Sequence, residues 1–379
     1  MTKSGEKITI LHVLSGFKGE YPLFNQVVQG LNEGYRHIVC YLVGPPSCKE
    51  VLCKAGYDIK WLQFRKNELR SFKYQVIREL YRIIKENGVH IIHAHRHKPA
   101  FYATFAALKN RNVRMVTSVH GMKRSRNLLR KISNRILWPK INTIIAVSEA
   151  VKRDILMANY WLPPDRIEVV HNGIDLSVFK RNDLVKMEAR TFFNLPPQRW
   201  LWGAVGRLAP VKGHDILLKA WARNEIGKHG GHLVIAGKGR LHDSLTALAE
   251  KLGIAKEITL LGHVSDIPKF LAALDGFAMP SLHEGFPLAI LEALASGLPV
   301  VAGKVGGIPE ILTLLEKNKY SFLVPSENEE KLGNAMEQVM GWSETHRQQA
   351  VTNIKQHAQL FDGNLMIARM DALYRDIAS

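Results

Sequence analysis

Cysteine and long apolar runs are both scarce in this chain of 379 residues. The three cysteines, Cys40, Cys48 and Cys53, have no metal-ligand spacing, and so low and odd a count is typical of a reducing compartment without disulfides. No apolar run reaches the ~18 residues that a helix needs to span a bilayer. The run Ile8–Leu14 is short, contains a histidine and lacks a small-residue cleavage site, so it predicts a buried strand and not a signal peptide. We therefore expect a globular cytoplasmic protein.

Acidic residues are absent from one long segment. No Asp or Glu lies between Glu86 and Glu149, and the whole chain has a formal net charge of +18. Such a field attracts an anionic partner, which is a lipid surface, a phosphorylated acceptor or nucleic acid. A solvated basic surface that only aids solubility is the alternative. The cations of this segment are Arg96, Lys98, Lys109, Arg111, Arg114, Lys123, Arg124, Arg126, Arg130, Lys131, Arg135 and Lys140.

The end of this basic segment predicts an amphipathic helix between Arg124 and Lys140. Leu128, Ile132 and Ile136 recur at every fourth position, and basic residues occupy the other face. This pattern fits a helix that lies on anionic lipid, and it equally fits a helix that packs its apolar stripe against its own domain. The candidate contacts to an acceptor or a membrane are Arg124, Arg126, Arg130 and Lys131.

Short apolar runs alternate with amphipathic segments along the whole chain. Strands that alternate with helices imply parallel sheets with right-handed crossovers, so the sequence predicts an α/β protein with two Rossmann-like, doubly wound domains facing across a cleft. We place the domains at 1–180 and 181–363. The predicted strands are Ile8–Leu14, Ile38–Val43, Val89–His93, Met115–Val119, Thr143–Val147, Trp202–Val205, His232–Ala236, Ile258–Leu261, Gly276–Met279 and Pro299–Ala302, and the predicted helices of the second half are Lys212–Trp221, Leu241–Leu252, Leu288–Ala295 and Ile308–Leu315.

Two glutamates, Glu284 and Glu292, flank a Gly-Phe-Pro turn. On one continuous helix they would lie about 12 Å apart, too far to contact one small group. We expect Glu284 in the turn and Glu292 two turns inside the following helix. Gly285 allows close approach to the backbone, Pro287 suits a first helical turn, and the free N–H groups there favour an anion. The element therefore indicates a long ligand with a charged middle and hydroxyls at both ends, which is the shape of a sugar nucleotide.

Two cations follow the first predicted strand of the second half, Arg207 and Lys212. Both can converge on a diphosphate, with Arg207 offering a bidentate fork and Lys212 a point charge. Neutralising a departing diphosphate is a transition-state task, so this would be catalysis as well as binding. A glycine-rich turn with two exposed cations is the alternative. The glycines after the strands, at Gly16, Gly206, Gly237 and Gly239, are weak signals of ligand contact by themselves.

Histidines cluster in His93-Ala94-His95-Arg96-His97 at the end of a predicted strand, where alternate side chains share a face. This pattern can indicate a metal, but no acidic or cysteine ligand lies nearby and no Asp-x-Asp occurs in the chain. We therefore expect no metal, with the two cations taking its place at the diphosphate. His95 would orient a substrate hydroxyl, unless it is only a polar residue at a strand end, and His120 competes for the same role.

The ordered set of motifs resembles the retaining glycosyltransferases of family 4, which have the GT-B fold, and among them the type that builds bacterial surface polysaccharide or lipopolysaccharide. The resemblance covers nearly the whole chain. The matching segments are the Gly16 loop, His93-Ala94-His95, Ala146-Val147-Ser148, His171-Asn172-Gly173-Ile174-Asp175, Gly206-Arg207, Lys212-Gly213, Gly237-Lys238-Gly239 and Glu284-x7-Glu292. The chain departs from the common Gly-Gly after the first strand, since it has Gly16-Phe17-Lys18-Gly19.

The resemblance implies a role for each matching position. Arg207 and Lys212 are expected to clamp the donor diphosphate. Glu284, with the backbone amides of Gly285 and Phe286, is expected to hold the transferred sugar and a phosphate. Glu292 is expected to bind the ribose hydroxyls, and His95 to lie near the donor sugar and the acceptor. The last helix, from 364 to 379, is expected to complete the N-terminal domain. The implied donor contacts are Gly16, Gly206, Gly237, Gly239, Gly285, Phe286, Pro287, Leu288 and Glu292.

The implied activity is the transfer of a hexose from a nucleotide sugar of the UDP or GDP type to an acceptor hydroxyl, with retention at the anomeric carbon and without metal or other cofactor. The basic segment favours a membrane-linked acceptor, such as a lipopolysaccharide core or an O-antigen, and a peripheral place on the cytoplasmic face of the inner membrane. A GT-B epimerase or phosphorylase would share the fold and part of the clamp. A nucleic-acid-binding protein would also explain the charge, but few aromatics interleave the basic segment, so we expect no nucleic acid.

Overall fold

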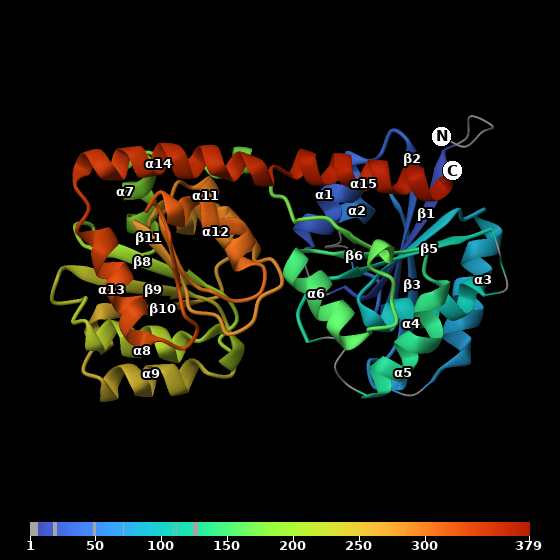
Figure 1. The fold of residues 1–379 in the computed structure, drawn as a ribbon, viewed down its shortest axis with the longest axis horizontal. Coiled ribbons are helices and arrows are strands. Elements are labelled where there is room, and N and C mark those ends of the chain that lie inside the picture. Colours follow the sequence, from blue (N-terminus) through green and yellow to red (C-terminus); the bar gives the residue numbers. More distant parts are fainter. Residues whose placement is uncertain are drawn as a thin grey trace. The chain divides into compact units, whose positions relative to one another are not determined.

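The computed structural model describes residues 7–17, 21–47, 51–70, 72–108, 110, 112–123 and 128–379. The chain forms two compact units (Figure 1). The first contains Met1–Asn172 and Gly363–Ser379, and the second contains Gly173–Asp362. No helix of the described residues combines the length and the apolar character that are needed to cross a membrane.

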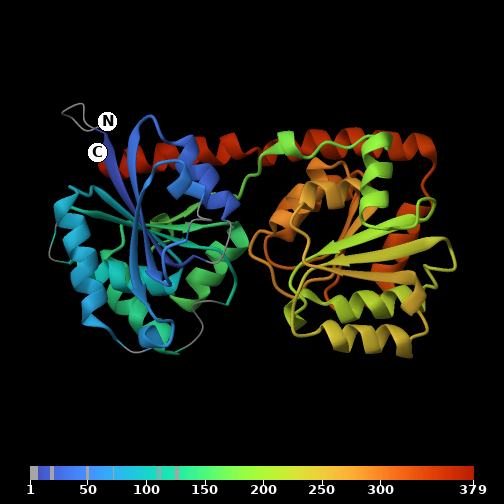
Figure 2. The same ribbon diagram turned by 180° about the vertical axis from the view of Figure 1, so that it is seen from behind.

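The first unit is built on a seven-stranded sheet with the strand order β3-β2-β1-β4-β5-β6-β7, in which every pairing is parallel. Figures 1 and 2 show α1 and α15 along one face of this sheet and α3, α4 and α5 along the other. The strands are β1 Ile8–Gly16, β2 Tyr35–Val43, β3 Asp58–Phe64, β4 Ile91–His95, β5 Arg114–Val119, β6 Thr143–Ala146 and β7 Ile167–Val169. The helices are α1 Pro22–Gly30, α2 Val51–Lys54, α3 Tyr74–Glu86, α4 His97–Ala107, α5 Leu128–Leu137, α6 Glu149–Ala158 and α15 Gly363–Ala378.

Helix α15, from the end of the chain, is part of the core of the first unit. Its Met366, Met370 and Tyr374 pack against Ile8 and other strand residues in one buried cluster. Burying such side chains contributes roughly 1.5–3 kcal/mol each, so this helix is a large part of the unit's stability. The expected helix from residue 364 thus lies in the unit that the sequence assigned to it.

The second unit repeats the architecture with a six-stranded parallel sheet in the order β10-β9-β8-β11-β12-β13. Figure 2 shows α8 and α9 on one face and α11, α12 and α14 on the other. The strands are β8 Trp200–Val205, β9 Gly231–Ala236, β10 Ile258–Gly262, β11 Gly276–Met279, β12 Val300–Gly303 and β13 Phe322–Val324. The helices are α7 Asp183–Phe192, α8 His214–Arg223, α9 His242–Lys251, α10 Ile267–Ala272, α11 Leu288–Ala295, α12 Ile308–Lys317, α13 Glu329–Met340 and α14 Glu344–Ala358.

Both sheets confirm the predicted α/β class of two Rossmann-like domains. In each unit the strand order reverses direction at one place, between β1 and β4 in the first and between β8 and β11 in the second. Ligands of open parallel sheets bind beyond the carboxyl ends of the strands at such a switch point. The loops after β1, β4, β8 and β11 are therefore the places to look for a site.

The boundary between the units differs from the sequence prediction of 180/181. The first unit ends at Asn172, because Ile174 already belongs to the second unit. The Ile174 N–H donates to the carbonyl of Phe361 at 3.0 Å, and Ile174 forms a parallel bridge with Asp362. The outgoing and returning segments are thus held together at the edge of the second unit.

Candidate functional site

Two loops of the second unit are bonded to each other beyond the carboxyl ends of β8 and β11. The Leu282 N–H donates to the carbonyl of Val211 at 2.9 Å. Gly213 has φ +64, and a Cβ atom there would lie 2.3 Å from the carbonyl oxygen of Pro280. Only glycine adopts this backbone conformation and leaves room for the Pro280 carbonyl.

The start of the predicted helix Lys212–Trp221 is wrong. Lys212 ends a 3-10 turn, and α8 begins after Gly213, at His214.

These loops join Lys212 and Glu284 in an ion pair, with Nζ and Oε1 2.6 Å apart. The side chains are only 19% and 12% exposed, so the pair is well shielded from water. The Lys212 stem lies over Gly206, since a Cβ atom there would be 3.4 Å from its Cδ and Cε atoms. Lys212, which is predicted to bind the donor diphosphate, thus directly contacts Glu284, which is predicted to hold the transferred sugar.

Gly306 fixes the backbone of Glu284 from the loop after β12. It has φ +55, and a Cβ atom at this position would lie 1.8 Å from the Glu284 carbonyl oxygen. The neighbouring Gly307 N–H donates to the carbonyl of Gly285 at 3.1 Å. The loops after β8, β11 and β12 therefore together determine where the Glu284 carboxylate lies.

We expect Gly306→Ala to displace Glu284, because the added Cβ would meet its carbonyl oxygen, and to lose about 1–3 kcal/mol of unfolding free energy and severalfold turnover beyond the loss that positive-φ strain alone causes. Gly253→Ala is the matched control, because Gly253 has φ +71 with nothing within 4 Å of its Cβ position. Chemical denaturation and turnover measured on both variants check this. Equal losses in the two variants would show that contact with Glu284 is unimportant.

Glu292 lies on α11, in the second turn after the Gly-Phe-Pro turn, and is half-buried. Burial raises the pKa of its carboxyl group to about 7. Pro287 is the N-cap of α11 and does not lie in its first turn, so the helix begins at Leu288. Phe286 is buried and packs its ring on Phe361, with ring centroids 5.7 Å apart.

The remaining predicted donor contacts of this unit divide into exposed and packed residues. Arg207 is exposed. Cβ atoms at Gly237 and Gly239 would lie 1.8 Å from the Gly206 carbonyl oxygen and 2.2 Å from that of Leu208. These glycines thus allow the loops after β8 and β9 to touch, which is a structural reason for them that requires no ligand.

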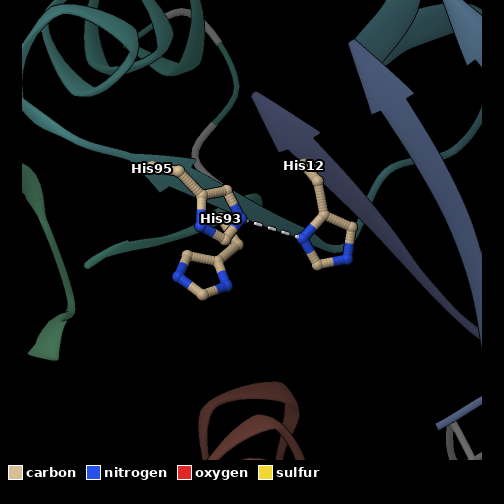
Figure 3. A group of neighbouring side chains, drawn as sticks. All are labelled: His12, His93 and His95. Carbon is tan, nitrogen blue, oxygen red and sulfur yellow. Dashed lines mark hydrogen bonds between the residues drawn. The ribbon is translucent and has the colours of Figure 1, made fainter. Parts of the chain in front are cut away.

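In the first unit, histidines form a row across one face of the sheet. His12 on β1 is paired in register with His93 on β4, and His95 lies two residues further on the same face. Figure 3 shows the three rings close together, with His12 Nδ1 3.3 Å from His95 Nε2. His12 Nε2 lies 3.0 Å from Nδ1 of His37 on β2.

The whole histidine row is held neutral. Burial, followed by neighbouring imidazoles, holds the pKa of His12 and of His95 well below the ordinary value, and burial lowers that of His93 to about 3. His120, the other candidate, is similarly lowered to about 4 by burial. Neutral imidazoles accept and donate one hydrogen bond each, so His95 is suited to orient a hydroxyl.

The sequence did not reveal His12 and His37 as site residues. A single histidine within an apolar run reads as part of a buried strand, and only the pairing of β1 with β2 and β4 brings these side chains to His95. Gly16, which ends β1, packs on β2, since a Cβ atom there would lie 2.7 Å from the Val43 carbonyl oxygen.

The predicted basic helix is present as α5, but its apolar stripe does not pack on its own unit. Leu128, Ile132 and Ile136 are 71%, 51% and 62% exposed. Of the candidate cations, Lys131 is exposed and Arg130 half-buried. Arg124 and Arg126 lie outside the described residues. The alternative of an apolar stripe buried within the domain is therefore wrong for the described helix.

Comparison with known proteins places both units in one class. The model described as "Glycosyltransferase Family 4" matches residues 29–178, and the model described as "Glycosyl transferases group 1" matches residues 185–357. A D-inositol 3-phosphate glycosyltransferase of Mycobacterium marinum is 41% identical over 161 residues, which are 41% of this chain and 33% of that protein. One of Segniliparus rotundus is 35% identical over 235 residues, 60% of this chain and 49% of that protein. The matches thus span a third to a half of the length of these relatives.

Solved structures with the same fold cover nearly the whole chain. A glycosyltransferase from Rickettsia africae superimposes with a TM-score of 0.82 at 22% identity over 98% of both chains. HepE of Anabaena, in complex with UDP and glucose, gives a TM-score of 0.83 at 20% identity over 97% of this chain and 99% of that chain. The matched models, the relatives and the fold agree, and the chain belongs to glycosyltransferase family 4, with the two Rossmann-like units of the GT-B fold.

Proposed function

We propose that the protein transfers a hexose from a nucleoside-diphosphate sugar to the hydroxyl of an acceptor, with retention and without a metal ion. The observation that carries this proposal is the shielded ion pair of Lys212 and Glu284 at the switch point of the second sheet. Family membership supports a transferase over an epimerase or a phosphorylase. HepE, a structural neighbour, was solved with UDP-glucose, which supports a sugar nucleotide as donor.

The ion pair gives the site a defined response to a diphosphate. Lys212 carries the positive charge that a leaving phosphate requires, and Arg207 on the same loop is exposed and available to the other phosphate. When Lys212 turns to the phosphate, the Glu284 carboxylate is released to accept hydrogen bonds from the sugar hydroxyls. Each interaction made only as the diphosphate departs lowers the barrier for transfer.

Retention requires that the acceptor attack from the face that the diphosphate leaves. The candidate carboxylates in the described part of the second unit are those of Glu284 and Glu292. Glu284 is paired with Lys212, and burial keeps Glu292 partly protonated near neutral pH. Neither is arranged as the free nucleophile of a retaining glycosidase. We therefore propose front-side attack, in which the leaving phosphate takes the proton of the acceptor hydroxyl and Lys212 stabilises its charge.

A ligand screen tests the donor site before any acceptor is known. We expect one of UDP, GDP and ADP to raise the melting temperature without added metal, because a ligand at 100 times its Kd stabilises by about 2.7 kcal/mol. Incubation with the matching sugar nucleotide, followed by product analysis, then separates transfer from epimerisation and phosphorolysis. No shift with any nucleotide, together with salt-sensitive binding to nucleic acid, would contradict the proposal.

We assign the acceptor to a membrane-linked glycan. The support is α5, where exposed Leu128, Ile132 and Ile136 accompany cations on an acid-free segment. An apolar stripe flanked by lysine and arginine is the pattern of a helix that lies in an anionic lipid interface. The protein would then work as a peripheral protein at the cytoplasmic face of the inner membrane.

Vesicle binding tests this surface. We expect Lys131→Gln to reduce partition onto phosphatidylglycerol vesicles about fivefold at low salt, since each cation near such a surface contributes about 1 kcal/mol. Lys251→Gln, an exposed lysine on α9, is the matched control. Sedimentation with vesicles measures both. Equal binding to uncharged phosphatidylcholine vesicles, or equal losses in the two variants, would contradict membrane docking.

A soluble phosphorylated polyol is the second candidate acceptor. The relatives from Mycobacterium and Segniliparus carry the name D-inositol 3-phosphate glycosyltransferase, and a basic first unit suits an anionic acceptor of this kind. Transfer assays with D-inositol 3-phosphate and with lipid-linked acceptors, run side by side, decide between the two.

A further inference from the structure

The histidine cluster of His12, His93 and His95 brings three possible metal ligands together in the first unit (Figure 3). One nitrogen atom of each residue lies within 4.8 Å of the others. The sequence shows His93, His95 and His97 in one run, and it predicted no metal because no acidic or cysteine ligand lies nearby. The structure supplies the third ligand from β1, because His12 is paired in register with His93.

We propose that His12, His93 and His95 bind a Zn²⁺ ion. Zinc bonds to histidine nitrogen at about 2.0–2.1 Å, so two nitrogen ligands of a tetrahedral ion lie about 3.3–3.4 Å apart. His12 Nδ1 and His95 Nε2 are 3.3 Å apart. This pair already has the spacing of two zinc ligands, and the ion would replace the hydrogen bond between them.

His93 becomes the third ligand when one of its ring nitrogens gives up its hydrogen bond to a hydroxyl and binds the ion. Its Nδ1 lies 2.6 Å from the Tyr374 hydroxyl, and its Nε2 lies 2.6 Å from the Ser118 hydroxyl. One nitrogen turns to the ion, and the other keeps its hydroxyl. His12 keeps His37 as the partner of its Nε2, at 3.0 Å. Histidine ligands ordinarily donate their second N–H to such an outer partner, so two of the three ligands already have one.

The chemistry of the cluster selects the ion. The three residues offer only imidazole nitrogen as ligand atoms. Imidazole suits Zn²⁺, Cu²⁺, Fe²⁺ and Ni²⁺, whereas Mg²⁺ and Mn²⁺ favour oxygen ligands. The tetrahedral spacing of His12 Nδ1 and His95 Nε2 favours Zn²⁺ among the former. His12 and His93 are buried and His95 is partly exposed, so an ion enters past His95 and keeps its fourth position for water.

The bound ion would inhibit and not catalyse. This consequence rests on the proposed function, in which His95 orients a substrate hydroxyl and Lys212 handles the diphosphate. A zinc ion that holds His95 Nε2 fixes the imidazole ring, so the ring cannot reorient toward the substrate hydroxyl. Added Zn²⁺ is therefore expected to reduce turnover, and a chelator to restore it.

Metal binding by the chelator-treated full-length protein tests the site without any substrate. Equilibrium dialysis is expected to give one tightly bound Zn²⁺ in the wild type, and Co²⁺ in its place is expected to give the intense visible absorption of a tetrahedral site. Both signals should be lost in His12→Asn and in His95→Asn. They should persist in His242→Asn, which removes an exposed histidine beside Asp243 and controls for surface binding.

The outcomes separate the two proposals. If His12→Asn does not fold, His95→Asn, at the partly exposed end of β4, still decides the test. The same zinc stoichiometry in all three variants, or only an octahedral Co²⁺ spectrum, would overturn the site. Zinc binding that leaves turnover unchanged would contradict the inhibition. A protein that binds zinc but transfers no sugar from any donor would leave the metal site standing and refute the proposed function.

Discussion

Replacement of Lys212 by alanine is expected to lower kcat about 10²–10³-fold, the loss seen when one preorganised donor to a developing oxyanion is removed. The charge of Lys212 lies 2.6 Å from Glu284 in a shielded place, so it is already at the site before the donor binds. Once Lys212 has turned to the donor phosphate, no further rearrangement is required when the phosphate departs. Steady-state kinetics with saturating donor measures the effect.

The same substitution leaves the Glu284 carboxylate without its cation in a shielded place. An unpaired buried polar group costs about 1–3 kcal/mol, so Lys212→Ala is expected to be less stable than the wild type. The double variant Lys212→Ala/Glu284→Gln removes this charge and should recover stability without recovering turnover. Lys219→Ala, on α8 and 43% exposed, is the matched control that should change neither. Near-normal turnover in Lys212→Ala would refute the diphosphate clamp.

The sequence predicted the central strands of both sheets because buried parallel strands are nearly continuous apolar runs. It missed β3, β7 and β13 for physical reasons. The edge strand β3 contains Asp58 and Lys60 and is only half-buried, and the edge strands β7 and β13 have three residues each. Edge strands are often short or charged, which protects them from pairing with other chains. For the same reason they lack the continuous apolar run from which a strand is predicted.

The elements that carry the candidate residues were predictable, but the contacts between these residues were not. The glycine and proline around Glu284 mark a turn, and the helix that carries Glu292 was predicted with the bounds that α11 has. The contact of Lys212 with Glu284 joins positions 72 apart and depends on the adjacency of β8 and β11. Likewise, apolar residues at every fourth position of α5 predict an apolar stripe, but they do not indicate whether that stripe faces the core or the solvent.

The pH dependence of Glu292 is expected to appear in both stability and donor binding. The pKa of its carboxyl group is raised by burial from 4.5 to about 7 in the folded protein. Between these values the folded chain keeps a proton that the unfolded chain has lost, so the free energy of unfolding falls as pH rises through this window. Glu292→Gln cannot ionise, and it should be more stable than the wild type at pH 8 by on the order of 2 kcal/mol and nearly equal to it at pH 5.

Donor affinity should depend on pH in the direction opposite to stability. If the ionised carboxylate accepts hydrogen bonds from the ribose hydroxyls, the affinity of the wild type for the nucleotide rises as pH increases through 7, whereas that of Glu292→Gln stays flat. A hydrogen bond to a charged group contributes about 1.5–3 kcal/mol, so the variant should bind roughly tenfold or more weakly at pH 8 and equally well at pH 6. Thermal unfolding and calorimetric titration of both proteins at the three pH values measure the two effects separately. A variant that gains stability at pH 8 but keeps full affinity would show that Glu292 is buried for packing and that another group binds the ribose.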